Sequence, residues 1–193
     1  MSNQLRMVWP KRLFHNLLRI ELPKGYGLRS FREGDEKMYV ELMRKAGFEN
    51  WPAERVQDIL NNPLSPDGIY FITFHGKLVA TACALDRTPE NERGAENLIG
   101  ELGWVACDPA HRGRHLGKVV CAAAMNHLLL HNYCSIFLLT DDWRLAAIKT
   151  YLELGFEPVV DTAEMQLRWE KVCEKLKWKL PNACDLKTSS QRR

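Results

Sequence analysis

The stretch from Gly100 to Gly117 reads Gly-Glu-Leu-Gly-Trp-Val-Ala-Cys-Asp-Pro-Ala-His-Arg-Gly-Arg-His-Leu-Gly. Its apolar part, Leu102 to Cys107, predicts a strand that ends at the turn pair Asp108-Pro109. A basic loop with glycines follows, and the apolar run Lys118 to His131 predicts a buried helix. A loop at a helix N-terminus presents free backbone N–H groups that suit a phosphate or pyrophosphate. Glycine-containing turns of this kind also occur in proteins that bind nothing there, so the loop alone does not establish a site.

The composition is that of a globular protein. The chain has 193 residues, 46% of them hydrophobic and 26% charged, and this length favours a single domain. No apolar run reaches the roughly 18–20 residues of a membrane span. Residues 1–10 lack the apolar core of a signal peptide. We therefore expect a cytoplasmic protein with no membrane partner.

The net charge of +3 is unevenly distributed. Residues 1–32 carry +6 and residues 168–193 carry +5, which leaves −8 for residues 33–167. An acidic middle suits a cationic acceptor such as an amine. The basic ends contain no dense block of Lys and Arg interleaved with aromatic residues, so we expect no nucleic-acid partner.

The six cysteines show no Cys-x-x-Cys spacing and no short spacing with histidine, so we expect reduced thiols and no metal site. Cys107 lies near the proposed ligand site. The sequence shows no base partner that would make it a nucleophile.

Periodicity and turn signals predict a mixed α/β order. Residues 1–12 read as a loose basic lead-in, and 13–22 as a short helix or an edge strand. Strands are predicted over 26–31, 69–74, 78–85, 98–107, 135–140 and 157–160. Helices are predicted over 36–46 (with Asp35 as N-cap), from Pro52 to Leu60, over 115–131, over 143–154 (capped by Asp141 or Asp142 and ended by Gly155), and from Thr162.

Two of these elements carry more specific expectations. The apolar strand 135–140 reads as covered on both faces, as in a parallel sheet. The last helix has the apolar positions Met165, Leu167, Trp169, Val172, Leu176 and Trp178. The fold class is therefore α/β, a mixed, mostly antiparallel central sheet with flanking helices and a C-terminal helix.

Three stretches carry a resemblance to a known family. They are the strand Glu101 to Cys107 with Asp108-Pro109, the loop Arg112-Gly113-Arg114-His115-Leu116-Gly117, and Ala147-Ile148-Lys149-Thr150-Tyr151 with Gly155-Phe156. With this order of elements, the chain resembles the GNAT superfamily of N-acetyltransferases from about Gly25 to Val160. The loop is similar to the family's acyl-CoA loop, and the last stretch is similar to its A-I-x-x-Y-x-x-x-G-F stretch. Leu22-Pro23-Lys24-Gly25-Tyr26 and Arg168-Trp169 faintly resemble mycothiol-synthase-like members.

The resemblance implies acetyl-CoA as cosubstrate, with no metal. The pantetheine arm would pair with the backbone of Val105, Ala106 and Cys107, and an N–H near Val105 would polarise the thioester carbonyl. The pyrophosphate would be held by the loop Arg112, Gly113, Arg114, His115, Leu116, Gly117 and Lys118.

The resemblance also implies a base and an acid. Glu101 matches the glutamate that takes a proton from the amine acceptor, and Tyr151 matches the general acid that protonates the departing CoA thiolate. Their structural alternatives are a polar strand end for Glu101 and packing for Tyr151.

Two residues depart from the family pattern. His115 stands at the first loop glycine, where its Cβ could crowd the pyrophosphate or its ring could help to bind it. Arg144 stands where the family often has Asn, and it could instead contact the phosphates of the cofactor.

The function implied is transfer of an acetyl group from acetyl-CoA to a primary amine of a small molecule or peptide. The alternatives are a catalytically silent acyl-CoA-binding module and a nucleotide-binding α/β protein, although the chain lacks a P-loop Gly-Lys-Ser/Thr. Trp51, Trp104 and Trp143 are candidates for the acceptor pocket, with buried packing as the commoner role. We interpret His111 as a loop histidine and His127 as a core histidine.

The chain is expected to divide into four parts. These are a lead-in over 1–24, an acetyltransferase domain over 25–160, a C-terminal helix over 161–180 that is a candidate homodimer interface, and a polar, disordered tail over 181–193.

Overall fold

The computed structural model describes residues 4–94 and 96–179, so the predicted tail and Cys184 lie outside the described residues. The described chain forms two compact units, whereas its length alone favoured one domain. Residues 16–136 form the large unit, and residues 4–15 with 137–179 form the small unit. The predicted domain boundaries stay predictions.

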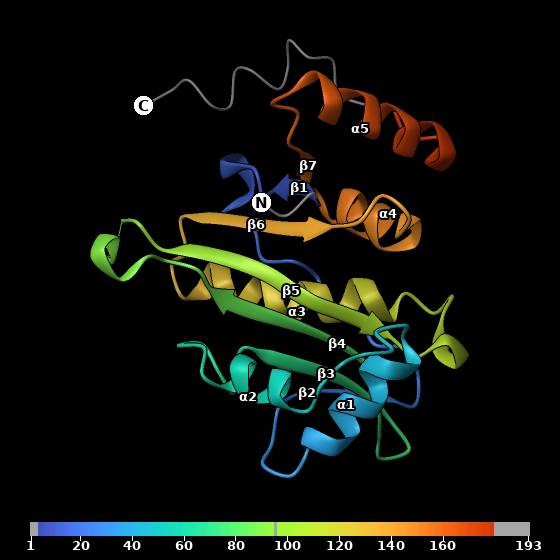
Figure 1. Cartoon of the computed structure of the whole chain (residues 1–193). Coiled ribbons are helices and arrows are strands. Elements are labelled where there is room, and N and C mark those ends of the chain that lie inside the picture. Colours follow the sequence, from blue (N-terminus) through green and yellow to red (C-terminus); the bar gives the residue numbers. More distant parts are fainter. Residues whose placement is uncertain (1–3, 95, 180–193) are drawn as a thin grey trace. The chain divides into compact units, whose positions relative to one another are not determined.

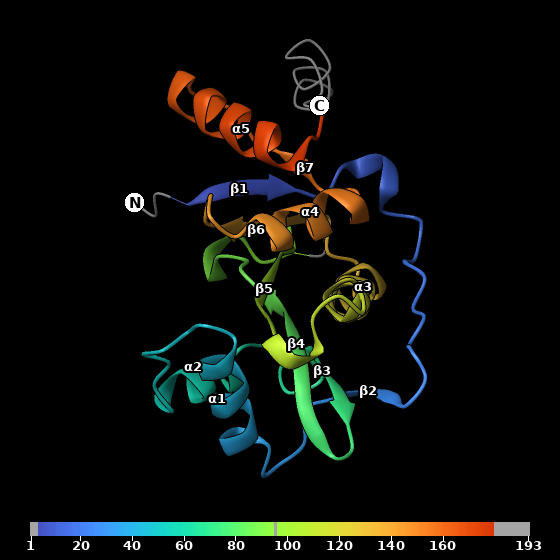
Figure 2. The same ribbon diagram turned by 90° about the vertical axis from the view of Figure 1, so that its right-hand side faces the viewer.

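The large unit is an antiparallel sheet in the order β2-β3-β4-β5, with helices on both faces (Figures 1 and 2). Helix α3 packs against β3, β4 and β5, and α1 packs against β4 and β5 on the other face. Its elements are β2 (Tyr26–Ser30), α1 (Glu36–Lys45), α2 (Glu54–Leu60), β3 (Ile69–Phe74), β4 (Lys77–Asp86), β5 (Ile99–Cys107) and α3 (Leu116–Leu130).

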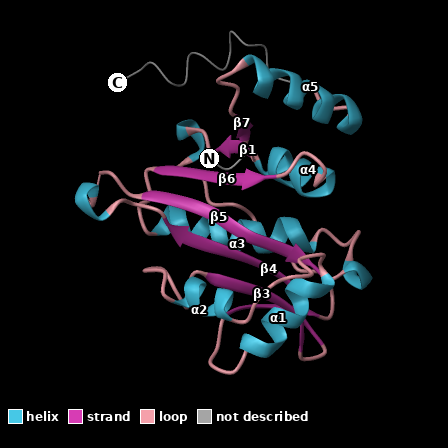
Figure 3. Ribbon diagram, in the orientation of Figure 1, coloured by secondary structure: helices cyan, strands magenta, loops and turns pink. Residues whose placement is uncertain are grey.

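The small unit is built on β1 (Leu5–Val8), which pairs antiparallel with β6 (Ser135–Thr140) and with β7 (Glu157–Pro158). Helix α4 (Leu145–Leu154) contacts α5 (Ala163–Leu176). Figure 3 shows these helices and strands by type. Gly155 ends α4 with a φ of +116°, a backbone conformation that glycine adopts without a steric penalty.

The N-terminal segment is more ordered than its composition predicts. The prediction of a loose lead-in is wrong for residues 5–8, which form strand β1 with the alternate side chains of Leu5 and Met7 fully buried. Of the element predicted over 13–22, only Leu13 falls in a regular structure, the short 3-10 helix Lys11–Leu13, and residues 14–22 form neither a helix nor an edge strand. Instead, the Leu18 backbone N–H donates to Asn126 Oδ1 (2.7 Å), and Asn126 Nδ2 donates to the Leu18 carbonyl (2.9 Å). A side chain of α3 thus supplies the backbone partners that a regular element would otherwise provide.

Three details of the small unit also differ from the predictions. Strand β6 is buried on one face only, because Leu139 is 37% exposed while Ile136 and Leu138 are buried, and β6 pairs antiparallel with β1. Neither Asp141 nor Asp142 caps α4, whose N-cap position is Arg144. Helix α5 does begin at the Thr162 cap, whose hydroxyl accepts from the Met165 N–H (3.1 Å). Its predicted apolar residue Leu167 is 58% exposed, while Trp169, Val172 and Cys173 form its buried face.

Helix α1 follows its predicted position, and Asp35 occupies its N-cap position as predicted. Its side chain makes no capping hydrogen bond, because the carboxylate accepts from both terminal nitrogens of Arg29 (2.5 and 2.8 Å) and from the Arg32 N–H (2.8 Å). Its hydrophobic side packs into an aromatic cluster around Tyr39, Phe71 and Trp51. The α1–α2 segment is therefore held on the face of the sheet that also carries the Trp104 ring.

Candidate functional site

Strand β5 is bulged at the centre of the predicted site. Cys83 of β4 lies opposite Gly103, but Thr81 lies opposite Ala106, so three steps along β5 match two along β4. Trp104 has a φ of +50°, which a bulky side chain rarely adopts. A bulge leaves the extra residue unpaired and interrupts the ladder. The interruption falls at Trp104 and Val105, and Val105 is one of the residues predicted to pair with a cofactor through its backbone.

The Trp104 ring is held from the α1–α2 segment. It lies edge-on to Trp51, with ring centroids 4.4 Å apart, and the Arg55 guanidinium lies 5.5 Å from its centroid. Trp51 is buried, as predicted, and Trp104 is half-buried. These contacts stabilise the unusual backbone of Trp104.

Glu101 lies on β5, opposite Leu85 of β4, with 15% of its side chain exposed. Its Oε2 accepts from Arg87 Nε at 2.5 Å, an ion pair that fixes one carboxylate oxygen. The sequence shows no signal for this partner, because the register that brings residues 87 and 101 together is set by the bulged β4–β5 ladder.

The basic loop after β5 is anchored at its base and exposed at its tip. Asp108 Oδ1 accepts from the Ala110 N–H (2.9 Å), and the Tyr26 hydroxyl lies 2.9 Å from His111 Nδ1. From there the backbone passes through two left-handed residues, Gly113 (φ +76°) and His115 (φ +58°), into α3. Residues 112–115 and Lys118 are exposed. The loop thus presents cationic side chains and the first N–H groups of a helix to solvent, which suits a polyphosphate.

Cys107 closes β5 as a neutral thiol. Burial raises its pKa above the ordinary value, and Arg112 and Arg114 only partly oppose this. Its Sγ lies 3.6 Å from the Asp108 carbonyl. This environment does not generate a thiolate nucleophile. The five cysteines in the described residues are all free thiols.

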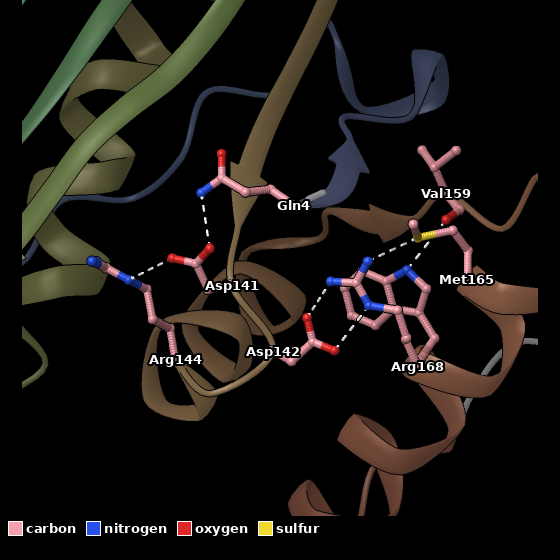
Figure 4. Close-up of polar contacts among 8 residues, drawn as sticks. Gln4, Asp141, Asp142, Arg144, Val159, Met165 and Arg168 are labelled. Carbon is pink, nitrogen blue, oxygen red and sulfur yellow. Dashed lines mark hydrogen bonds and ion pairs between the residues drawn. The ribbon is translucent and has the colours of Figure 1, made fainter. Parts of the chain in front are cut away.

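The other two predicted site residues lie in the small unit, Arg144 at the N-cap position of α4 and Tyr151 within that helix. Arg144 Nε lies 3.2 Å from Asp141 Oδ2, and its guanidinium lies 4.6 Å from the Trp143 ring centroid. Trp143 is 72% exposed, so the expectation of buried packing is wrong for it. Tyr151 is buried, with its ring centroid 6.2 Å from that of Phe156. Figure 4 shows the Asp141–Arg144 pair beside the Gln4 amide that also binds Asp141.

The predicted residues thus fall into two groups. Glu101, the backbone of Val105 to Cys107 and the loop Arg112 to Lys118 belong to the large unit, and Arg144 and Tyr151 belong to the small unit. Within residues 4–94 and 96–179, no cluster of three or more His, Cys, Asp or Glu side chains could hold a metal ion. Over the same residues, no helix is both long and apolar enough to cross a membrane.

Comparison with known proteins gives the family. The model of the Acetyltransferase (GNAT) family matches residues 36–156. A mycothiol acetyltransferase of Thermobispora bispora is 30% identical over 143 residues, which cover 70% of this chain and 48% of that protein. A mycothiol acetyltransferase of Kocuria rhizophila is 28% identical over 152 residues, covering 72% of this chain and 48% of that protein. The chain therefore spans about half the length of the curated relatives it matches.

Solved structures give the fold. A putative GNAT-family acetyltransferase of Novosphingobium aromaticivorans matches with a TM-score of 0.59 and 19% identity, covering 80% of this chain and 59% of that one. The predicted mixed α/β sheet fold with flanking helices is thereby confirmed, and so is the family resemblance seen in the motifs. The chain belongs to the GNAT family of acetyltransferases.

Proposed function

We propose that this protein transfers the acetyl group of acetyl-CoA to a primary amine. The observation that carries the proposal is the continuity of two features, because the bulged strand β5 leads through an anchored turn into the exposed basic loop before α3. A pantetheine arm contains amide groups that need backbone partners, and the pyrophosphate beside it needs N–H donors and positive charge. The residues present fit both requirements.

Three groups of this chain would carry the reaction. Glu101 would take a proton from the ammonium form of the acceptor, directly or through water, so that the nitrogen lone pair can attack the thioester carbon. The Val105 N–H would stabilise the negative charge that develops on the carbonyl oxygen. The new C–N bond forms, and when the tetrahedral intermediate collapses the C–S bond breaks and Tyr151 would give its proton to the leaving thiolate. The attacking nitrogen then loses its second proton, which returns through water to the Tyr151 phenolate and leaves a neutral amide and the CoA thiol.

Arg87 has a supporting place in this scheme. Because it binds Oε2 of Glu101 at 2.5 Å, it fixes the direction in which the carboxylate presents its other oxygen. In the loop, Arg112, Arg114 and Lys118 would hold the pyrophosphate together with the backbone of Gly113 to Gly117. Arg144 is a further proposed phosphate contact through its position in the family pattern.

The acceptor is proposed only as a class. Relatives of this chain are named mycothiol acetyltransferases, which favours a small molecule over a peptide. Residues 33–167 carry a net charge of −8, and this favours a cationic amine over an anionic one.

Binding is tested first, by thermal shift with acetyl-CoA, CoA, ATP and NAD in parallel. A ligand at a hundredfold excess over its dissociation constant stabilises the folded state by about 2.7 kcal/mol, or about 5–10 °C in Tm for a chain of this size. We expect a shift with the two CoA species alone. A shift with ATP or NAD alone would identify a nucleotide-binding protein instead.

Turnover is tested next, by following release of the CoA thiol with a panel of amines. Glu101→Gln and Tyr151→Phe should lower kcat by about 10²-fold or more while the Kd for acetyl-CoA stays near the wild-type value. If neither variant changes the rate, these residues are not the base and the acid. Binding of acetyl-CoA without turnover of any amine would support the catalytically silent module.

A further inference from the structure

Arg87 is bound to the proposed base through one nitrogen only. Its Nε donates to Glu101 Oε2 at 2.5 Å, and its two terminal nitrogens have no partner within residues 4–94 and 96–179. Arg29 of the same unit shows the contrast, because both of its terminal nitrogens donate to Asp35 (2.5 and 2.8 Å). The Arg87 side chain is also 44% exposed. The planar end of its guanidinium is therefore available to a ligand, directly beside the carboxylate that would take the amine proton.

The backbone that carries Arg87 is held on both sides. Asn62 binds the preceding residue twice, since its Oδ1 accepts from the Asp86 N–H (2.9 Å) and its Nδ2 donates to the Asp86 carbonyl (3.0 Å). The Arg87 N–H donates to the Ile99 carbonyl (2.7 Å), and the following N–H, that of Thr88, donates to Asp86 Oδ1 (2.8 Å). An arginine presented from backbone that is held in this way loses less conformational freedom when it binds an anion.

The two carboxylate oxygens of Glu101 have different neighbours. Oε2 binds Arg87, whereas Oε1 lies next to Gly103, because a Cβ added to Gly103 would be 3.5 Å from it. Gly103 directly precedes the bulge at Trp104 and Val105. The oxygen that Arg87 leaves free is thus the one beside the backbone segment that we propose for the thioester, and the guanidinium lies at the other oxygen.

We propose that the amine acceptor is a small zwitterion with a carboxylate a few bonds from its amine, and that Arg87 binds this carboxylate. The inference rests on the proposed function and names its substrate class. A carboxylate and the two terminal nitrogens of a guanidinium form a pair of parallel N–H···O bonds, which are strong and directional. Glu101 would face the ammonium and Arg87 the carboxylate, so opposite charges meet at both ends of the acceptor. A zwitterion keeps the ammonium group that the net charge of −8 over residues 33–167 favours.

Pairs of amines that differ only in the carboxylate test this assignment. Glycine, phenylalanine, β-alanine and 4-aminobutyrate are each compared with their own carboxamide, and butylamine and phenethylamine extend the panel to simple amines. With acetyl-CoA as donor, kcat and KM are measured for the wild type, Arg87→Gln and Arg87→Lys. The acid-to-amide ratio of kcat/KM is then compared between enzymes, so that the different reactivity of the two amines cancels.

Arg93→Gln is the matched control. Arg93 lies in the same loop with 43% of its side chain exposed, and its Nη1 already pairs with Asp86 Oδ2 (2.8 Å). Its replacement removes the same charge from the loop without removing the proposed contact. Thermal unfolding of each variant sets an assay temperature at which all of them are folded.

The wild type should prefer at least one acid over its amide. Arg87→Gln should lower that acid-to-amide ratio by about 10–100-fold, mainly through the KM of the acid, which is the scale of hydrogen bonds to a charged group. Loss of the orienting contact with Glu101 should lower kcat as well, but for the acid and the amide alike. Arg87→Lys should retain part of the preference, because lysine keeps the charge without the paired donors. Arg93→Gln should keep the wild-type ratio.

The inference is overturned if the wild type acetylates amides or simple amines but prefers no acid, or if the preference for an acid survives in Arg87→Gln. An equal loss of preference in Arg93→Gln would also overturn it, because the preference would then follow the charge of the loop. In these cases turnover itself remains and the proposed function stands. If the wild type acetylates no amine of either kind, the proposed function fails and the inference falls with it.

Discussion

Replacing His115 by glycine should stabilise the protein. His115 occupies the N-cap position of α3 with φ +58° and ψ +17°, and its side chain makes no capping hydrogen bond. For a residue with a Cβ, the left-handed conformation costs about 1–2 kcal/mol. Glycine avoids that cost but loses about 0.5–1 kcal/mol through its greater freedom in the unfolded chain. The imidazole is exposed, so little packing is lost.

The balance is a gain of about 0.5–1 kcal/mol in the free energy of unfolding, or about 1–4 °C in Tm for a chain of this size. Differential scanning calorimetry of the wild type, His115→Gly and His115→Ala measures it. Alanine removes the imidazole and keeps the Cβ, so His115→Ala should not share the gain. An equal rise in both variants, or a fall in His115→Gly, would show that backbone strain at this position is not what limits stability.

The same variants separate the two roles that His115 could have toward the pyrophosphate. If its Cβ crowds the phosphate, His115→Gly should bind acetyl-CoA more tightly and His115→Ala should resemble the wild type. If the imidazole binds the phosphate, both variants should bind acetyl-CoA more weakly and by similar factors. Calorimetric Kd values therefore assign the residue whichever way the stability changes.

Three further sets of substitutions test other parts of the structure. Burial pushes the pKa of Asp35 upward, but hydrogen bonds from Arg29 and the Arg32 N–H outweigh it and hold the pKa below its ordinary value. A depressed pKa in the folded state gives stability that is present above the unfolded value of about 3.9 and is lost as the pH falls through the folded value. Asp35→Asn should therefore lower the free energy of unfolding by about 2 kcal/mol at pH 7, and urea titrations should show a smaller fall in that free energy below about pH 4 than in the wild type. Arg168→Gln and Asp142→Asn should each destabilise the protein modestly, because Arg168 Nε donates to the Asp142 carboxylate at 3.0 Å. A double-mutant cycle should give a coupling energy of about 1 kcal/mol, which is low because 42% of the Asp142 side chain is exposed. Additive effects of the two substitutions would show that this ion pair does not contribute to stability. Gly103→Ala should cost about 1–3 kcal/mol because its Cβ would lie 2.7 Å from Leu85 Cδ1, while Gly94→Ala, with no atom within 4 Å of its Cβ, should stay within about 0.5 kcal/mol of the wild type.

Patterns local in sequence predicted most of the helices and strands. The α3 run, the β3–β4 hairpin and the Gly155 stop each depend on residues within one element or its adjoining turn, so periodicity and turn chemistry suffice for them. The predictions are wrong where contacts with residues distant in the sequence determine the local structure. Residues 5–8 become a strand through pairing with β6 and β7, and within the irregular stretch 14–22 the backbone N–H and carbonyl of Leu18 bind the Asn126 side chain.

The residues of the candidate site also divide into those that local sequence patterns predicted and those that depend on distant contacts. The basic loop and the residues Glu101 and Tyr151 were identifiable from motif spacing, because the family pattern is itself local. The Arg87 partner of Glu101 and the edge-on contact of Trp51 with Trp104 depend on strand register and helix placement, which no spacing in this chain encodes. The exposure of Trp143 follows from how its loop is tied to Gln4 and to Arg168, and both partners are remote in sequence.

Backbone strain gives evidence about the site that is independent of the motifs. Among the described residues, five other than glycine have a positive φ: His75, Trp104, His115, Asn132 and Lys177. His75 lies in the β3–β4 turn, and Asn132 and Lys177 follow helix ends, where the left-handed region is ordinary. Trp104 and His115 have no such explanation, and both fall in the segment from β5 to α3 that the family pattern selects. Strained residues persist where the surrounding structure holds them, and they gather at functional sites. The contacts of Trp104 with Trp51 and Arg55 hold the backbone at the bulge, so the unusual backbone geometry falls in the same segment that we propose for acyl-CoA binding.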